Sequence, residues 1–158
     1  MTNTEALRAE QREVREAIEA IGHAMYRVNE AVERIRSART LGTIDTWFGG
    51  GLFTSLVKRD ELDRADVLMR NVDLALAGVR RELADIGVTE ELGGVGQDPL
   101  HRTLDVWFDN LFSDLATQSR IKDAGQRLET LDSALTRVQS VLGRREASLS
   151  ERIRAAED

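Results

Sequence analysis

Apolar residues in the first forty positions recur at alternating spacings of three and four, which places them on one face of a helix. The series has a single polar step, at Gln11, and residues 2–4 offer helix-capping side chains before it. We therefore expect one long helix over residues 1–40, ended by Gly42. The apolar positions of this seam are Leu7, Val14, Ile18, Ile21, Met25, Val28, Val32 and Ile35.

The rest of the chain contains an internal duplication. Residues 43–83 align with residues 103–142, with one residue fewer in the second copy. Both tryptophans and all four phenylalanines of the chain fall inside the aligned segments. We expect two repeat units, residues 43–87 and 98–157, each forming a short aromatic helix followed by a long helix.

Each long helix of the repeat is expected to begin at a capping residue, Asp60 in the first unit and Ser119 in the second. Gly87 is expected to close the first, and a break near residues 143–145 is expected in the second. The apolar positions of the first are Leu62, Ala65, Met69, Val72, Leu76, Val79, Leu83 and Ile86. Those of the second are Ile121, Ala124, Leu128, Leu131, Leu135, Val138, Leu142, Leu149 and Ile153.

These patterns predict an all-α fold. Its architecture would be an elongated antiparallel bundle of three long heptad helices plus two short aromatic helices, with the first helix packed against both others. A chain of 158 residues supports one hydrophobic core, so residues 1–158 are expected to form a single domain. Helix ends that overhang the bundle would invite a second copy, which favours a homodimer.

Charge and composition exclude several classes of protein. The chain carries 22 Lys and Arg against 28 Asp and Glu, a net charge of −6, so nucleic acid is a poor candidate partner. It has no apolar run long enough for a membrane span, and no apolar core of a signal peptide near its first residue. The absence of cysteine fits a reducing compartment, and we expect a cytoplasmic protein.

The chemistry-bearing residues give no sign of an enzyme. His23 and His101 are the only histidines, and neither has a glutamate three residues before it, as a di-metal helical bundle would need. No nucleophile-elbow, zinc-protease or phosphate-loop motif is present. We expect no catalytic residue, no metal and no cofactor.

The run Gly49, Gly50, Gly51 is open to two interpretations. Three glycines disfavour helix, so the run is expected to form a tight corner between helices. The same backbone freedom would also allow exposed N–H groups to bind an anion or a partner's carboxylate.

The aromatic residues around this run are likewise open to two interpretations, as internal core or as a groove that anchors a partner. Together with the three glycines they are the candidate partner-binding residues: Trp47, Phe48, Leu52, Phe53, Trp107, Phe108 and Phe112.

The run from Asp45 through Trp47 and the three glycines to Leu52, followed by Lys58, Asp63 and Ala65, resembles a pattern in uncharacterised bacterial all-helical proteins. The resemblance covers the repeat units and implies no activity.

The resulting hypothesis is a non-enzymatic interaction or scaffolding protein that binds a protein partner or itself. Two alternatives stay open. One is a helical protein that lies on a membrane surface or forms filaments, and the other is a regulator that binds an anion or small molecule at residues 49–51.

Overall fold

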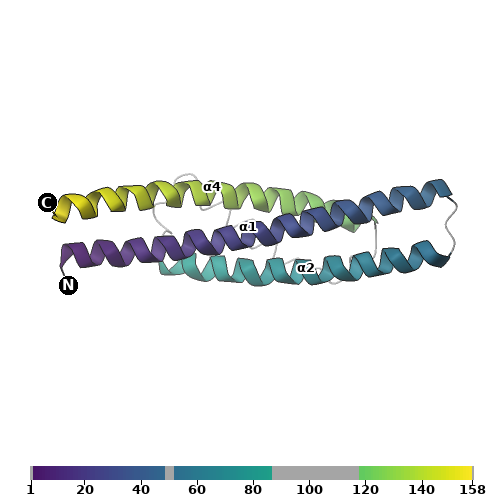
Figure 1. Ribbon diagram of the computed structural model, residues 1–158, viewed down its shortest axis with the longest axis horizontal. Coiled ribbons are helices and arrows are strands. Elements are labelled where there is room, and N and C mark those ends of the chain that lie inside the picture. Colours follow the sequence, from purple (N-terminus) through teal and green to yellow (C-terminus); the bar gives the residue numbers. More distant parts are fainter. Residues whose placement is uncertain (1, 49–51, 87–117, 158) are drawn as a thin grey trace.

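The computed structural model contains three long helices: α1 (Asn3–Phe48), α2 (Leu52–Asp85) and α4 (Gln118–Glu157) (Figure 1). The structure describes residues 2–48, 52–86 and 118–157, and side chains over residues 2–37, 63–64, 67–86 and 124–157. All regular structure within these ranges is helical, so the predicted all-α class is confirmed.

The helices form an elongated bundle in which α1 contacts both other helices (Figure 1). Both α2 and α4 run antiparallel to α1, and they are therefore parallel to each other. At 46 residues α1 is about 70 Å long. The described parts of α1 and α4 extend beyond the last turn of α2 at the end where both chain termini lie. None of the helices, as far as they are described, has an apolar stretch that could cross a membrane.

A capping box opens α1. The backbone N–H of Thr2 donates to Glu5 Oε2 at 2.7 Å, and the backbone N–H of Glu5 donates to Thr2 Oγ1 at 3.2 Å. This reciprocal pair occupies backbone donors that would otherwise have no partner in the first helical turn. The bond from the Thr2 backbone also lowers the pKa of Glu5. The predicted capping segment, residues 2–4, therefore does begin the helix.

The buried face of α1 is wider than the predicted seam. Five residues of that seam are buried at strict seven-residue intervals, whereas Ile18, Met25 and Val32 are only partly buried. A row of alanines, absent from the prediction, is buried instead. A helix that packs against two neighbours needs a broader apolar stripe than one heptad seam supplies. The buried positions of α1 are Leu7, Val14, Ala17, Ile21, Ala24, Val28, Ala31 and Ile35.

The apolar positions predicted for the other two helices are confirmed wherever their side chains are described. Only Leu83 among them is partly rather than fully buried. Two alanines, Ala75 and Ala134, are buried in addition and occupy aligned positions of the proposed repeat. The buried residues of all three helices belong to one hydrophobic cluster. The duplication itself stays a prediction from the sequence.

Two predicted boundaries in the first half of the chain are wrong. Gly42 does not end the first helix, because a single glycine weakens a helix by only about 1 kcal/mol and α1 is supported by packing against α2. The first short aromatic helix does not exist as a separate element, since α1 continues to Phe48 and α2 begins at Leu52. Asp60 consequently lies inside α2 and is not its N-cap.

The predicted start of the last long helix and the predicted break within it are also wrong. α4 begins at Gln118, one residue before the predicted cap Ser119, and runs without interruption to Glu157. Residues 143–145 are helical throughout. The second short aromatic helix was predicted in residues that lie outside the described part of the chain.

Substitution of Gly143 tests the continuity of α4. A Cβ atom at this position would meet nothing within 4 Å, so Gly143→Ala is expected to raise the free energy of unfolding by about 1 kcal/mol. In a chain of this size the melting temperature would rise by roughly 2–4 °C, measurable by circular dichroism. Gly143→Pro should instead lower the free energy of unfolding by about 3 kcal/mol. If proline were as well tolerated as alanine, α4 would be broken at this point.

Candidate functional site

The residues predicted to bind a partner lie, as far as they are described, at the end of α1 and the start of α2. Trp47 and Phe48 are the last two residues of α1, and Leu52 and Phe53 are the first two of α2. The side chains of these four residues lie outside the described part of the structure. So do the remaining predicted residues: Gly49, Gly50, Gly51, Trp107, Phe108 and Phe112.

A different cluster is described in full, between α1 and α4 near the termini. The apolar seam of α1 is interrupted at Glu10 and Gln11, and that of α4 at Arg145 and Glu146. Because the helices are antiparallel, the two interruptions lie at the same level and their polar side chains meet. We call this cluster the polar layer; its members are Glu10, Gln11, Arg15, Arg145, Glu146 and Ser150.

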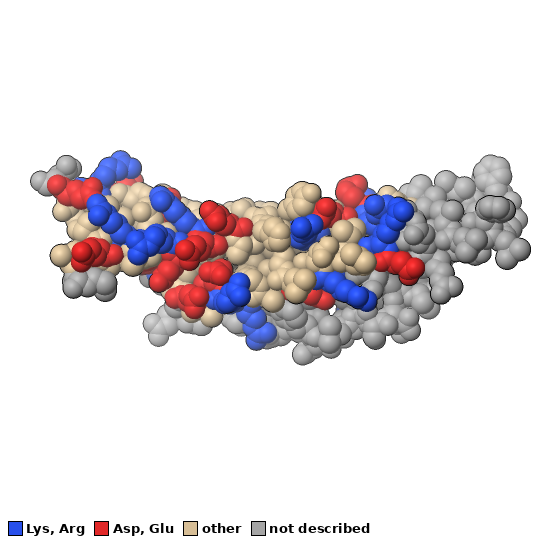
Figure 2. All heavy atoms as spheres, turned by 60° about the horizontal axis from the view of Figure 1, so that its bottom comes forward, with Lys and Arg blue, Asp and Glu red and all other residues tan. Residues whose placement is uncertain are grey.

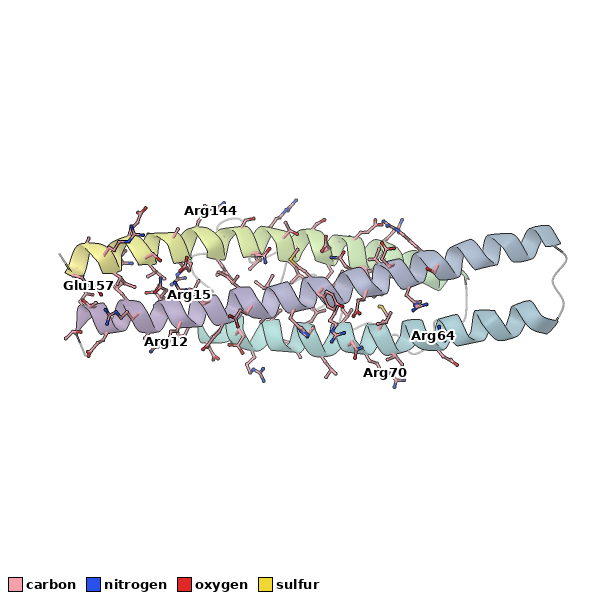
Figure 3. The ribbon with its side chains drawn as sticks, viewed as in Figure 1. Arg12, Arg15, Arg64, Arg70, Arg144 and Glu157 are labelled. Atoms are coloured by element: carbon pink, nitrogen blue, oxygen red, sulfur yellow. The ribbon has the colours of Figure 1, made fainter. Side chains whose placement is uncertain are left out.

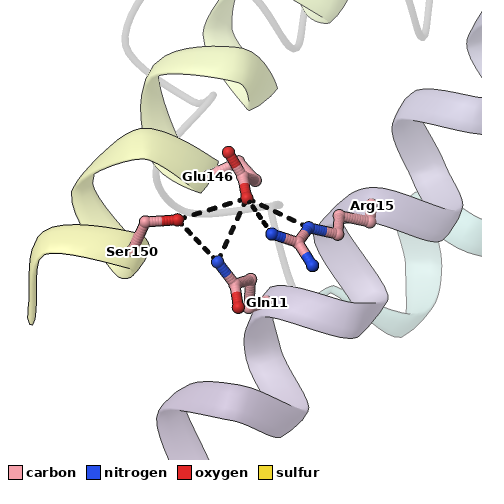
Figure 4. Close-up of polar contacts among 4 residues, drawn as sticks. All are labelled: Gln11, Arg15, Glu146 and Ser150. Atoms are coloured by element: carbon pink, nitrogen blue, oxygen red, sulfur yellow. Dashed lines mark hydrogen bonds and ion pairs between the residues drawn. The ribbon is translucent and has the colours of Figure 1, made fainter. Parts of the chain in front are cut away.

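Glu146 is the centre of the polar layer (Figure 4). Its Oε1 atom accepts bonds from Arg15 Nη2 at 2.7 Å and from Arg15 Nε at 3.0 Å. The same oxygen accepts from Gln11 Nε2 at 3.1 Å and from Ser150 Oγ at 3.3 Å. Gln11 also donates to Ser150 Oγ at 2.7 Å, which closes the network. Two residues of α1 and two of α4 are thus held in one register.

Two further ion pairs join the same helices. Arg145 donates from Nη2 and Nε to Glu10 Oε1, at 2.7 and 3.0 Å. Nearer the chain termini, Arg8 pairs with Glu157. Figure 3 shows Arg15 between α1 and α4, whereas Arg144 points away from α1 on the outer side of α4. Neighbouring arginines of α4 therefore differ in role, since only Arg145 faces the partner helix.

The charge of Glu146 is stabilised by its surroundings. The hydrogen bond from the Arg15 guanidinium lowers the pKa of Glu146 most, and desolvation raises it by a smaller amount. The positive charge of Arg15 and the bonds from Ser150 and Gln11 lower the pKa further. The Glu146 side chain is 25% exposed, so solvent screens the pair and its contribution to stability is modest.

A second feature is an open groove between α1 and α2. It has a volume of about 270 Å³, just below the range of about 300–1,000 Å³ that is usual for small-molecule pockets, and it is open to solvent. Arg27 at its edge pairs with Glu30 at 2.8 Å, and its guanidinium lies 5.5 Å from the centre of the Tyr26 ring. We call it the α1/α2 groove; it is lined by Ala20, His23, Arg27, Asn71, Leu74, Ala75 and Gly78.

The surface beside the groove carries unusually exposed apolar side chains. Leu74 is 73% exposed and Val67 is 55% exposed. They are seven residues apart in α2 and therefore lie on the same face of the helix. Tyr26 of α1 is 59% exposed. Figure 2 shows acidic and basic side chains interspersed over one face of the described part of the molecule, without a large patch of one sign.

The described residues contain no group of three or more His, Asp or Glu side chains arranged to hold a metal ion. The chemistry available in the polar layer and the groove is hydrogen bonding, ion pairing and apolar contact. Both features are therefore suited to holding helices or polypeptide surfaces together.

Sequence reasoning missed the polar layer as a site, although both of its signals were visible. The polar step at Gln11 and the irregularity near residues 143–145 were interpreted separately, one as a gap in a seam and one as a break in a helix. Only the pairing of α1 with α4 shows that they belong together. Leu74 was missed because it lies outside the predicted seam of its helix.

The chain matches no protein-family model, and no curated protein or solved structure gives a significant match. The class that the fold defines is an all-α helical bundle.

Replacing Glu146 by Gln tests the charge at the centre of the polar layer. A carboxylate whose pKa is lowered on folding adds stability above its ordinary value of 4.5, and this stability is lost as the pH falls through the lowered pKa. Glu146→Gln should therefore reduce the free energy of unfolding at neutral pH, by about 1 kcal/mol or less. At about pH 3 the difference should be smaller, because part of the Glu146 carboxylate is then protonated in the folded state.

Urea unfolding at both pH values measures this effect, with the exposed Glu151→Gln as the matched control. An equal loss at both pH values would show that the Glu146 contribution does not depend on its charge.

Proposed function

We propose that this chain is a non-enzymatic helical-bundle protein that acts by protein–protein interaction, as a scaffold or a regulator. The observation that carries the proposal is Leu74, which is 73% exposed at the rim of the α1/α2 groove. Val67 is a second exposed apolar side chain on the same face of α2, two helical turns away. The proposal rests on the pairing of an exposed apolar side chain with an adjacent hollow, because helix-in-groove recognition uses an apolar side chain that enters such a hollow.

The favoured partner is a second copy of the chain. Ala20, Ala75 and Gly78 line the α1/α2 groove with little side-chain volume, and Leu74 projects beside the hollow that they leave. One surface thus offers both a protruding side chain and a space for one. In a twofold dimer every contact is made twice, so Leu74 of each copy can enter the groove of the other. A different protein with an exposed apolar side chain is the alternative occupant.

The net charge of −6 and the mixed charges on the face shown in Figure 2 support a protein partner over nucleic acid, which requires a basic face. The proposal includes a cytoplasmic setting, which rests on the lack of cysteine in the sequence. Partner binding by residues 47–53 and by Trp107, Phe108 and Phe112 stays a separate prediction from the sequence.

Leu74→Asn tests the proposal. The wild-type mass, measured by light scattering over a concentration series, is expected to rise from 17.7 kDa toward twice that value. The variant should remain at the monomer mass at concentrations where the wild type dimerises. Because Leu74 is exposed, the free energy of unfolding of the variant should differ from that of the wild type by less than about 0.5 kcal/mol.

Ala84→Asn, at another exposed position of α2, is the matched control and should dimerise like the wild type. A wild type that stays monomeric throughout the series would contradict the dimer. If the Leu74 variant dimerised as strongly as the wild type, the interface would lie elsewhere.

A further inference from the structure

The bundle differs in composition along its length. The terminal end, defined as residues 3–16 of α1 and 143–157 of α4, buries four apolar residues: Leu7, Val14, Leu149 and Ile153. The three-helix part, defined as residues 17–37, 67–86 and 124–142, buries nineteen. α2 stops short of the outermost turns of the terminal end (Figure 1). Hydrophobic burial therefore stabilises the terminal end much less than the rest of the bundle.

Charged residues are concentrated in the same segment. The terminal end carries seven arginines and seven glutamates, so it is neutral at pH 7. The three-helix part, about twice as long, carries eight arginines and eight acidic residues. When the glutamates are protonated, the arginines of the terminal end keep their charge and its net charge rises toward +7. Repulsion at such short range opposes the pairing of α1 with α4.

The ion pairs across the terminal end, and most of its other polar contacts, depend on ionised carboxylates. Glu146 receives its bonds from Arg15 and Gln11 of α1 and from Ser150 of its own helix. Glu10 receives the Arg145 guanidinium, and Glu157 pairs with Arg8. At the last turns of α2 the charged groups are Arg80, the pair Arg81–Glu82, and the exposed Asp85. Protonation of Glu10, Glu146 and Glu157 weakens the three ion pairs between α1 and α4.

We propose that acid opens the terminal end as a local unit, separating α1 from α4 there and exposing Leu7, Leu149 and Ile153, while the three-helix part stays folded. This separation of α1 from α4 needs no movement of α2, because the ion pairs of the polar layer join only α1 and α4. When the pH falls, this opening exposes an apolar surface at one end of the molecule.

Hydrogen exchange of the full chain, read as protection factors by segment, tests this inference. At about pH 3 the protection of residues 3–16 and 143–157 should fall by about 100-fold or more relative to neutral pH. Protection of the three-helix part should fall by less than about tenfold. Addition of about 0.5 M salt at the low pH should restore part of the lost protection, because it screens the arginines from one another.

The double variant Glu10→Gln, Glu146→Gln separates the carboxylates from other effects of acid. It should lose protection in the terminal end already at neutral pH, while the matched control Glu151→Gln behaves like the wild type. The inference is overturned if the terminal end stays protected at low pH. It is equally overturned if both parts lose protection together in a single transition.

Discussion

One helix, α1, packs against two antiparallel partners at once, and the remaining structure depends on how its surface is divided between them. The large buried residues, repeating every seven positions from Leu7 to Ile35, supply the shared core. Ala17, Ala24 and Ala31 widen the buried stripe next to Ala20 and Arg27, which line the groove against α2. Small side chains in that row allow close approach of a neighbouring helix.

Near the chain termini, α1 meets α4 through polar groups. Gln11 and Arg15 bind Glu146, and Glu10 binds Arg145, at the level where neither helix offers a seam residue. A polar group within an otherwise apolar seam adds little stability, but it disfavours every register that would leave it without a partner. Shifting α4 along α1 by one turn would separate these charged groups from their present partners. The polar layer therefore selects the antiparallel register, whereas the apolar core supplies most of the stability.

Much of the fold could be predicted from residue spacing. The periods of three and four gave the helical class and the buried positions of α2 and α4, because those helices each present one seam. The alanine row was missed because alanine is equally common on exposed helix faces. These alanines are buried only because α1 packs against a second helix. The boundaries at Gly42 and Asp60 were wrong because local signals for stopping and capping are weaker than packing along a whole helix.

The candidate sites were harder to predict for a related reason. Arg145 and Glu10 are 135 positions apart, and no local pattern pairs them. The groove arises from small residues of two helices, which individually carry no chemical signal. The aromatic residues drew attention because they are rare, whereas Leu74 is one leucine among many. Its exposure is a property of the folded chain.

The most direct measurement of the register between α1 and α4 is a charge-reversal cycle at Glu10 and Arg145. Each single reversal, Glu10→Arg or Arg145→Glu, places two like charges within the polar layer and should lower the free energy of unfolding, measured by urea denaturation. The double reversal should recover most of that loss, because the ion pair is restored with its partners exchanged. If the two losses simply added in the double variant, α1 and α4 would not meet at these residues, and the role of the polar layer in selecting the register would be contradicted.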